Sequence, residues 1–300
     1  MAAKPTAPAL RARKRRTGSD PLVMVTAYDA PSARAAAAAG VDLILVGDSV
    51  ANNVLGYDDT LQVTVDDIAH HTAAVHRTLR RPAPGQPVPG GSEPLVVADL
   101  PWMSYHTGPV DAVNNAAQLV RAGAGAVKLE GGRKRLGVVE AILDAEIPVM
   151  GHLGLTPQSV HTMGGYRVQA KQSEAAAQLL DDARALSDAG CFAVVLEGVP
   201  ESVAELVTDE IDAPTIGIGA GVHCDGQVLV FHDVLGWNES VPKFVRQYAD
   251  LQGEASQALS RWVADVRGGN FPGDAESYHA PAEVTDSLRN RPRLRPVGSA

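Results

Sequence analysis

Charged, hydroxyl and imidazole side chains stand at or just after the ends of five short apolar runs in this chain. They are Asp48 and Ser49, Asp99, Lys128 and Glu130, His152, and Glu197. Carboxylates are hard oxygen ligands that suit Mg²⁺ better than zinc, and no cluster of cysteines or histidines competes with them. One such acid alone is more simply explained as a solvent-facing or ion-paired residue. Taken together, Asp48, Asp99 and Glu130 predict a divalent metal site.

Three of these positions raise the question of acid–base chemistry. Lys128 and Glu130 are two residues apart, so both point the same way from an extended strand and must be paired or bound to something. Glu197 ends the apolar run 194–196, and apolar surroundings raise the pKa of a carboxyl group toward the range useful for a general base. We therefore predict that Glu197 abstracts a proton, with an arginine-paired structural glutamate as the alternative. For His152, pocket lining and a structural hydrogen-bonding role both remain open.

Alternating apolar runs and amphipathic stretches must position these side chains. Runs rich in Val and Ile separated by Ala-rich segments are typical of parallel strands separated by helices. In an eight-stranded barrel the carboxyl ends of the strands form one face, where the polar residues would meet. An open doubly wound sheet shows the same alternation, but no Gly-x-Gly-x-x-Gly turn follows the first run, which disfavours its dinucleotide-binding version. The expected strands are Leu22–Ala27, Val41–Gly47, Leu95–Ala98, Ala126–Leu129, Pro148–Gly151, Phe192–Leu196, Thr215–Ile218 and Val228–Phe231.

The remaining segments suggest one domain with two tails. Residues 1–20 carry a basic run and are expected to form a flexible tail, residues 21–267 a single barrel domain, and residues 268–300 an irregular C-terminal tail. Residues 242–266 have a helical pattern. The Pro- and Gly-rich segment 81–93 is expected to be an exposed loop.

Composition excludes several classes of protein. The 300 residues are 45% hydrophobic and 20% charged, with a net charge of −9, which indicates a globular protein and disfavours nucleic acid as a partner. No stretch approaches the roughly 20 apolar residues needed to span a bilayer. The only two cysteines, Cys191 and Cys224, form no disulfide framework and fit the reducing cytoplasm. Cys191 opens an apolar run and is expected to be a buried thiol.

Several motifs resemble those of the 3-methyl-2-oxobutanoate hydroxymethyltransferases. The likeness runs from about Leu22 to Leu251, and the block from Gly151 to Val160 is long enough to be specific. The matching segments are Val23–Asp29, Val46–Ser49, Val97–Asp99, Val127–Gly132, Gly151–Val160, Leu196–Pro200 and Ile216–Gly221.

The resemblance implies a (β/α)₈ TIM barrel of the phosphoenolpyruvate mutase-like kind, with C-terminal helices. It also implies one Mg²⁺ per subunit, a 2-oxo acid substrate, 5,10-methylenetetrahydrofolate as cosubstrate, a place in pantothenate biosynthesis, and a homo-oligomer, commonly a decamer. Matched by motif, the metal ligands would be Asp48, Asp99 and Glu130. The substrate contacts would be Asp48, Ser49, Asp99 and Lys128, and the base Glu197.

The chain departs from the family pattern at residues 50–53 and in the longer loop 82–93, and neither change removes a ligand. Two other functions stay open. A carbon–carbon lyase or mutase of the phosphoenolpyruvate type would also enolise a 2-oxo acid over Mg²⁺, but it would want an acid or nucleophilic cysteine in a loop. A catalytically silent barrel that acts as an assembly scaffold would not need the polar strand ends.

Overall fold

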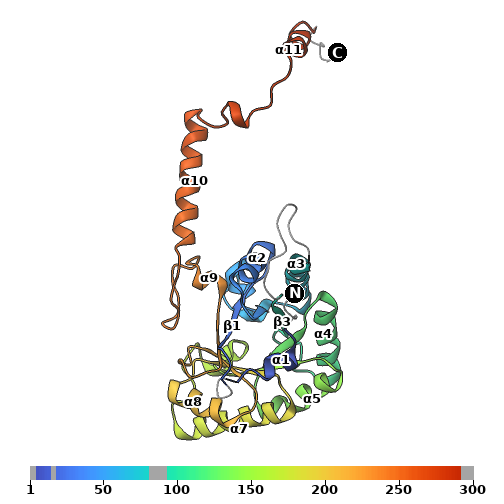
Figure 1. The fold of residues 1–300 in the computed structure, drawn as a ribbon, viewed down its shortest axis with the longest axis vertical. Coiled ribbons are helices and arrows are strands. Elements are labelled where there is room, and N and C mark those ends of the chain that lie inside the picture. The colour runs from blue at the N-terminus through green and yellow to red at the C-terminus, as the bar shows by residue number, and fades with distance from the viewer. Residues whose placement is uncertain (1–4, 15–17, 81–92, 292–300) are drawn as a thin grey trace, which may run out of the picture. The chain divides into compact units, whose positions relative to one another are not determined.

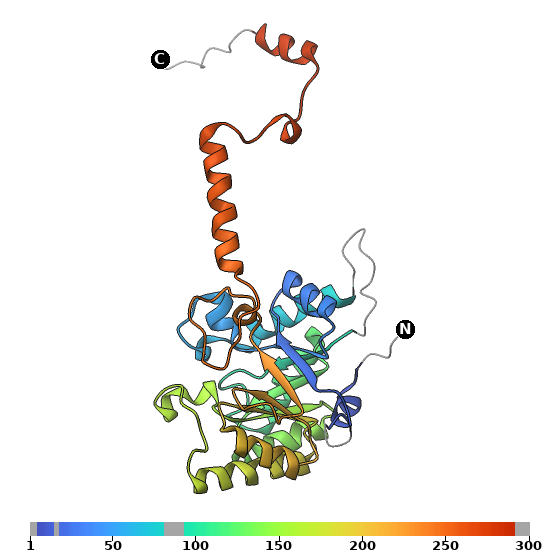
Figure 2. The same cartoon turned by 60° about the vertical axis from the view of Figure 1, so that its left-hand side comes forward.

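Eight parallel strands form a closed barrel in the order of the sequence, as predicted. The computed structural model describes residues 5–14, 18–80 and 93–291, so the predicted loop 82–93 lies almost entirely outside the described residues. β1 and β8 lie side by side and close the ring (Figure 2). The strands are β1 Leu22–Thr26, β2 Leu43–Val46, β3 Leu95–Asp99, β4 Ala126–Glu130, β5 Val149–Gly154, β6 Ala193–Glu197, β7 Thr215–Ile218 and β8 Gly226–Leu229.

Helices surround the strands and follow most of them in alternation (Figure 1). The first, α2, begins at a capping aspartate: the Asp29 carboxylate accepts a hydrogen bond from the Ser32 N–H at 2.9 Å. It ends at Gly40, whose φ of 80° only glycine adopts without strain. The helices that follow strands are α2 Ala30–Ala39, α3 Val65–Arg80, α4 Pro109–Ala122, α5 Leu136–Asp144, α7 Ser173–Ala189, α8 Glu201–Glu210 and the short α9 Phe231–Val234.

Alternate residues of each strand face different cores. In β2, Leu43 and Leu45 belong to the cluster inside the barrel, whereas Ile44 and Val46 belong to the cluster between the strands and the helices. This division follows from the two-residue period of a strand and leaves both faces apolar. The inward-facing residues change from apolar to polar only at the carboxyl ends of the strands, so that one rim of the barrel is charged.

The N-terminal segment is part of the barrel, which corrects the prediction of a flexible tail through residue 20. A short helix, α1 Ala7–Arg11, places Leu10 against the apolar interior of the barrel, where it is 2% exposed. The Lys14 ammonium lies buried 2.8 Å from the Asp225 carboxylate and donates to the carbonyl of Thr208 at 2.6 Å. Residues 7–14 therefore close the end of the barrel opposite the charged rim.

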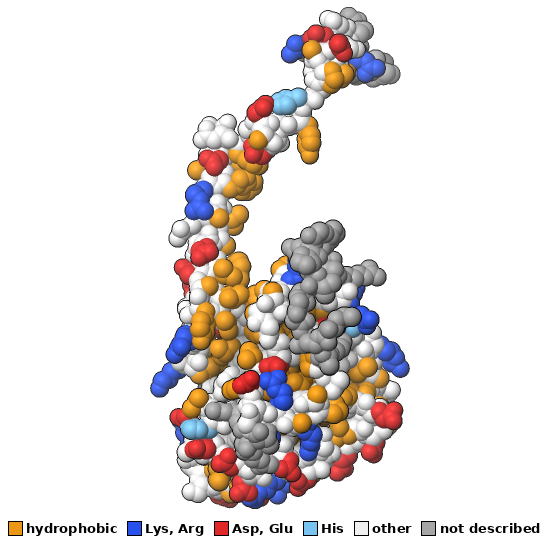
Figure 3. Space-filling view, in the orientation of Figure 1, with side chains coloured by type: hydrophobic (Ala, Val, Ile, Leu, Met, Phe, Trp, Pro, Cys, Tyr) orange, Lys and Arg blue, Asp and Glu red, His pale blue; other side chains and the backbone are white. Residues whose placement is uncertain are grey.

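A second compact unit comprises residues 250–300, so the barrel unit ends at residue 249 and not at 267. The helix predicted over 242–266 begins only at Leu251, where the Asp250 carboxylate accepts from the Gly253 N–H at 2.9 Å. Its α10 spans Leu251–Gly268, and α11, Ala282–Arg289, interrupts the segment predicted to be irregular. Hydrophobic side chains lie along α10 (Figure 3), among them Leu259, Trp262 and Val266 at helical spacing.

Among the described residues, no helix is both long enough and apolar enough to cross a lipid bilayer.

Candidate active site

A pocket of about 110 Å³ opens at the carboxyl ends of the strands. Its volume is far below the roughly 300–1,000 Å³ typical of sites for drug-sized ligands, so it suits a small molecule. The structure brings all seven predicted residues to its wall: Asp48, Ser49, Asp99, Lys128, Glu130, His152 and Glu197.

Lys128 pairs with Asp99 rather than with Glu130. Asp99 and Lys128 are register partners on β3 and β4, and their side chains meet at 2.9 Å while both are buried. Burial lowers the pKa of Lys128, but the carboxylates of Asp99, Asp48 and Glu130 outweigh burial and raise it. Lys128 therefore stays a cation at physiological pH.

The carboxyl group of Asp48 is disfavoured in its charged form by its surroundings in the pocket. It is 5% exposed, and burial together with the negative charges of Asp99 and Glu130 raises its pKa to about 8. The Lys128 ammonium and a hydrogen bond from Gln158 oppose this shift only in part. The Asp48 backbone N–H donates to Asp99 Oδ2 at 2.9 Å, so the two acids are held close together. The pocket thus holds more negative charge than its own cations neutralise.

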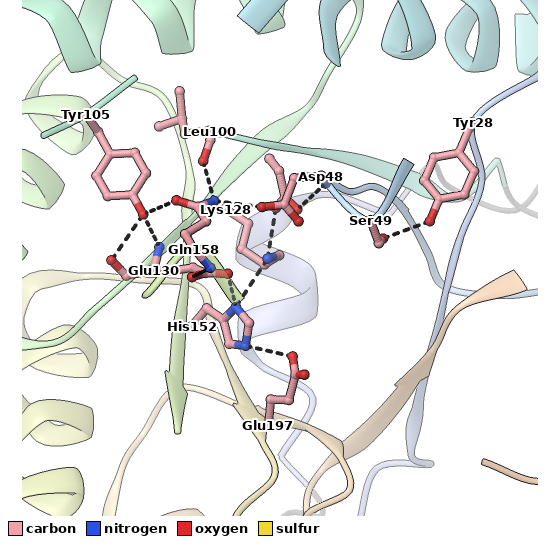
Figure 4. A network of polar contacts seen from close by, with 11 residues as sticks. Tyr28, Asp48, Ser49, Leu100, Tyr105, Lys128, Glu130, His152, Gln158 and Glu197 are labelled. Atoms are coloured by element: carbon pink, nitrogen blue, oxygen red, sulfur yellow. Dashed lines mark hydrogen bonds and ion pairs between the residues drawn. The ribbon is translucent and has the colours of Figure 1, made fainter. Parts of the chain in front are cut away.

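His152 lies between two glutamates (Figure 4). Its Nδ1 is 3.2 Å from Glu130 Oε1, and its Nε2 is 3.2 Å from Glu197 Oε2. Burial and the Lys128 ammonium lower the pKa of His152, but its contacts with both glutamates outweigh them and raise it to about 9. The imidazole is then protonated and makes an ion-pair contact with each glutamate, although His152 Nε2 and Glu130 Oε1 form no well-directed hydrogen bond among the described residues. His152 Nδ1 also lies 3.3 Å from Lys128 Nζ, the ammonium that lowers its pKa.

The surroundings of Glu197 differ from those that the sequence predicted. The sequence predicted apolar surroundings for this carboxylate, whereas the side chain is 16% exposed to the pocket and its Oε2 faces the imidazole. Sequence reasoning left the place of His152 open, and the structure puts it at the centre of the site. The imidazole contacts Oε2 of Glu197, and no such contact with His152 is made by Oε1.

Three polar residues of the site were not predicted. Tyr28 is buried and its hydroxyl lies 2.8 Å from Ser49 Oγ, while Tyr105 and Gln158 contact each other beside Glu130 (Figure 4). Burial raises the pKa of both tyrosines, which therefore stay protonated. Tyr28 and Gln158 lie within segments that carry the family resemblance, and that was the one signal that pointed to them.

The donor set fits a divalent cation that is also bound by substrate or water. Among the described residues, no three His, Cys, Asp or Glu side chains are grouped closely enough to hold a metal ion by themselves. Mg²⁺ usually takes only one or two carboxylates and completes its shell with water and substrate oxygens. Asp99 Oδ1 and Glu130 Oε1 are buried, and beyond their ion-pair contacts with Lys128 and His152 they accept no well-directed hydrogen bond within the described ranges, so each oxygen keeps a lone pair for a cation. The three-carboxylate cage stays a prediction.

A family model described as "Ketopantoate hydroxymethyltransferase" matches residues 4–274. A relative from Koribacter versatilis (strain Ellin345), named 3-methyl-2-oxobutanoate hydroxymethyltransferase, is 49% identical over 90% of this chain and 88% of its own length. A protein of the same name from Pyrobaculum islandicum (strain DSM 4184 / JCM 9189 / GEO3) is 52% identical over 85% of this chain and 93% of its own length.

Among solved structures, the chain is similar to 2,3-dimethylmalate lyase, described as a member of the PEP mutase/isocitrate lyase superfamily. The TM-score is 0.54 at 19% identity, with 94% of this chain and 96% of that chain covered. At that identity the likeness shows the fold alone, and it agrees with the predicted phosphoenolpyruvate mutase-like barrel.

Proposed function

The chain belongs to the ketopantoate hydroxymethyltransferase family, and we propose that it transfers a hydroxymethyl group from 5,10-methylenetetrahydrofolate to 3-methyl-2-oxobutanoate. The product is ketopantoate, an intermediate of pantothenate biosynthesis. The observation that carries the proposal is the small pocket in which a protonated His152 holds Glu197 beside an acid-rich centre.

The pocket wall has a charged side and an apolar side. The Lys128 ammonium and the Ser49 hydroxyl are the groups that bind the substrate carboxylate, because a cation and a neutral donor both satisfy its oxygens. Val195, Ile218 and Val228 line the same pocket and offer apolar contacts to the branched end of a 2-oxo acid. This division orients a substrate that has one charged end and one apolar end.

Mg²⁺ would be held by Asp48, Asp99 and Glu130. When bound, the cation polarises the 2-oxo group and acidifies the neighbouring C3–H bond. Asp48 and Asp99 are held close together by the Asp48 N–H, so that they approach a ligand from one side. Glu130 is anchored by the Gln158 backbone N–H at 3.0 Å, and its Oε1 contacts His152.

Glu197 is the proposed base. Its Oε2 is fixed by His152, so we assign removal of the C3 proton to Oε1. The 3.2 Å contact with the imidazole fixes the orientation of the Glu197 carboxylate at the pocket wall. The same contact stops the side chain from turning away from the pocket.

The two other functions that the sequence left open gain no support. A lyase or mutase would want an acid cysteine at the site, but both cysteines of the chain are buried and neither lines the pocket. Burying polar side chains costs free energy, and seven of them line this pocket. A protein that acts only as a scaffold gains nothing that offsets this cost.

Assembly into a homo-oligomer, commonly a decamer in the family, is part of the proposal. The exposed apolar side chains Leu259, Trp262 and Val266 of α10 support it, because contiguous apolar surface marks sites of protein interaction. Multi-angle light scattering on the purified chain measures the subunit number, and a monomer at micromolar concentration would contradict it.

The activity is tested by proton exchange. The C3 position of 3-methyl-2-oxobutanoate is followed by NMR in D₂O, with and without Mg²⁺, before methylenetetrahydrofolate is added. We expect exchange that depends on Mg²⁺ and that turns into ketopantoate formation when the folate is present. Exchange without product would favour a lyase or mutase, and no exchange in either condition would favour a scaffold.

A further inference from the structure

Gln158 lies at the point where two of the pocket's carboxylates meet. It belongs to the short helical turn η5, Pro157–Ser159, beyond the end of β5, and it is 6% exposed. Its amide Nε2 donates to Asp48 Oδ2 at 2.8 Å and to the Leu100 carbonyl at 3.1 Å. Its own backbone N–H donates to Glu130 Oε2 at 3.0 Å. One residue thus binds an oxygen of each acid (Figure 4).

Tyr105 determines which way the Gln158 amide faces. The Tyr105 hydroxyl accepts a hydrogen bond from the Glu130 backbone N–H at 3.2 Å, so its own proton is free to point elsewhere. It donates that proton to Gln158 Oε1 at 2.6 Å, which is a closer acceptor than the Glu130 carbonyl at 3.3 Å. With Oε1 engaged, the two N–H groups of the amide must face Asp48 and Leu100, because an amide has donors on one atom only. A turned amide would place Oε1 against the Asp48 carboxylate.

A neutral donor has a particular advantage here. Asp48, Asp99 and Glu130 repel one another in a buried setting, as the raised pKa of Asp48 reflects. A lysine or arginine in place of Gln158 would hold the Asp48 carboxylate but would also cancel the charge that attracts a divalent cation. An amide holds Oδ2 by a hydrogen bond and leaves the full negative charge of the carboxylate for the cation.

We propose that Gln158, with its amide set by Tyr105, is a positioning residue that turns Oδ1 of Asp48 and Oε1 of Glu130 toward the cation. This inference rests on the metal site of the proposed function. Residues that hold metal ligands from behind contribute about 10- to 100-fold to metal affinity, and Gln158 holds two ligands at once.

The first test measures Mn²⁺ binding to the full chain without substrate, by electron paramagnetic resonance. Gln158→Met keeps the length of the side chain and the backbone N–H that holds Glu130, but it removes the amide that holds Asp48 Oδ2. We expect Mn²⁺ to bind about 10- to 100-fold more weakly. The matched control is Gln178→Met, which removes an exposed amide that donates to the Asp182 carboxylate at 3.2 Å. The control should bind Mn²⁺ as the unaltered chain does. Unaltered Mn²⁺ binding in Gln158→Met would overturn the proposal.

The second test asks whether Tyr105 acts through Gln158. Tyr105→Phe keeps the buried ring and loses the hydroxyl, and we expect weaker Mn²⁺ binding than in the unaltered chain. In the Gln158→Met background the same change should add nothing, because its target is gone. An equal loss in both backgrounds would show that Tyr105 acts independently. Tyr105→Phe alone also tests the proposal if Gln158→Met does not fold.

A merely structural role is separated by two further readouts. If Gln158 positions ligands, excess Mg²⁺ restores the turnover of Gln158→Met, whereas a misshapen pocket is not rescued by metal. Binding of Mn²⁺ with no exchange or product in the unaltered chain would sink the proposed reaction and leave the role of Gln158 standing. No Mn²⁺ binding by the unaltered chain would overturn both.

Discussion

The protonated state of His152 can be tested through the stability of the metal-free protein. The pKa of this histidine rises from 6.5 to about 9 on folding. Because the folded state binds the proton more tightly, the contribution to stability is complete below pH 6.5 and is lost as the pH rises through 9. The size of the contribution is about 3 kcal/mol, since each pKa unit corresponds to about 1.4 kcal/mol.

His152→Gln removes the titrating group and should flatten this part of the profile. We expect the difference in the free energy of unfolding between the two proteins to shrink by about 3 kcal/mol between pH 6 and pH 9.5. The raised pKa of Asp48 also makes the folded state less stable as the pH rises to about 8. That loss is present in both proteins and cancels in the difference.

The assay is urea unfolding followed by circular dichroism, in EDTA, at half-unit steps of pH. His223→Gln is the control, because His223 is 43% exposed and does not line the pocket. It should reproduce the profile of the unaltered chain. Parallel profiles for His152→Gln and the unaltered chain would refute the imidazolium between the two glutamates, and with it our account of how Glu197 is held.

Three further predictions concern the site and the barrel. Glu197→Gln should still bind substrate and metal but lose C3–H exchange by about 10²- to 10⁴-fold; NMR in D₂O measures the rate, and normal exchange removes Glu197 as the base. Asp99→Ala should raise the Mg²⁺ concentration needed for half-maximal exchange, and an unchanged Mg²⁺ titration excludes Asp99 as a ligand. Lys14→Met should lower the free energy of unfolding by about 3–5 kcal/mol, because it removes the buried ammonium that lies 2.8 Å from the Asp225 carboxylate. Urea unfolding measures that loss, and a change below about 1 kcal/mol would show that the ion pair contributes little.

The strands could be predicted because each is a short apolar run, and all eight expected strands are present. The eighth was placed two residues late: β8 begins at Gly226, and the expected end at Phe231 is the start of α9. A glycine carries no strand signal, yet Gly226 is required there because a Cβ would lie 2.5 Å from the Leu22 carbonyl. The close packing of β1 on β8 thus requires Gly226 at the start of β8, and a search for apolar runs does not detect a glycine.

The site was predictable where its residues end strands and not where they reach the pocket from elsewhere. Asp48, Asp99 and Glu197 follow apolar runs, so their convergence follows from the barrel. Gln158 belongs to a loop, and nothing local shows that its amide meets a carboxylate 110 residues away. Lys14 is a similar case, because a basic run after Pro and Ala looks like a solvated tail until the partner carboxylate is seen.

The joining of β1 to β8 has a consequence for synthesis on the ribosome. Met24 pairs with Val228, so the first strand has no partner on one side until most of the chain has been made. The contact between Lys14 and Asp225 spans 211 positions and also cannot form earlier. Contacts this distant in sequence form slowly, and the unpaired strand edge is open to wrong association in the meantime. In a nascent chain that stalls before residue 225, β1 therefore keeps an unpaired edge and Lys14 lacks its contact with Asp225. We expect such a chain to depend on chaperones.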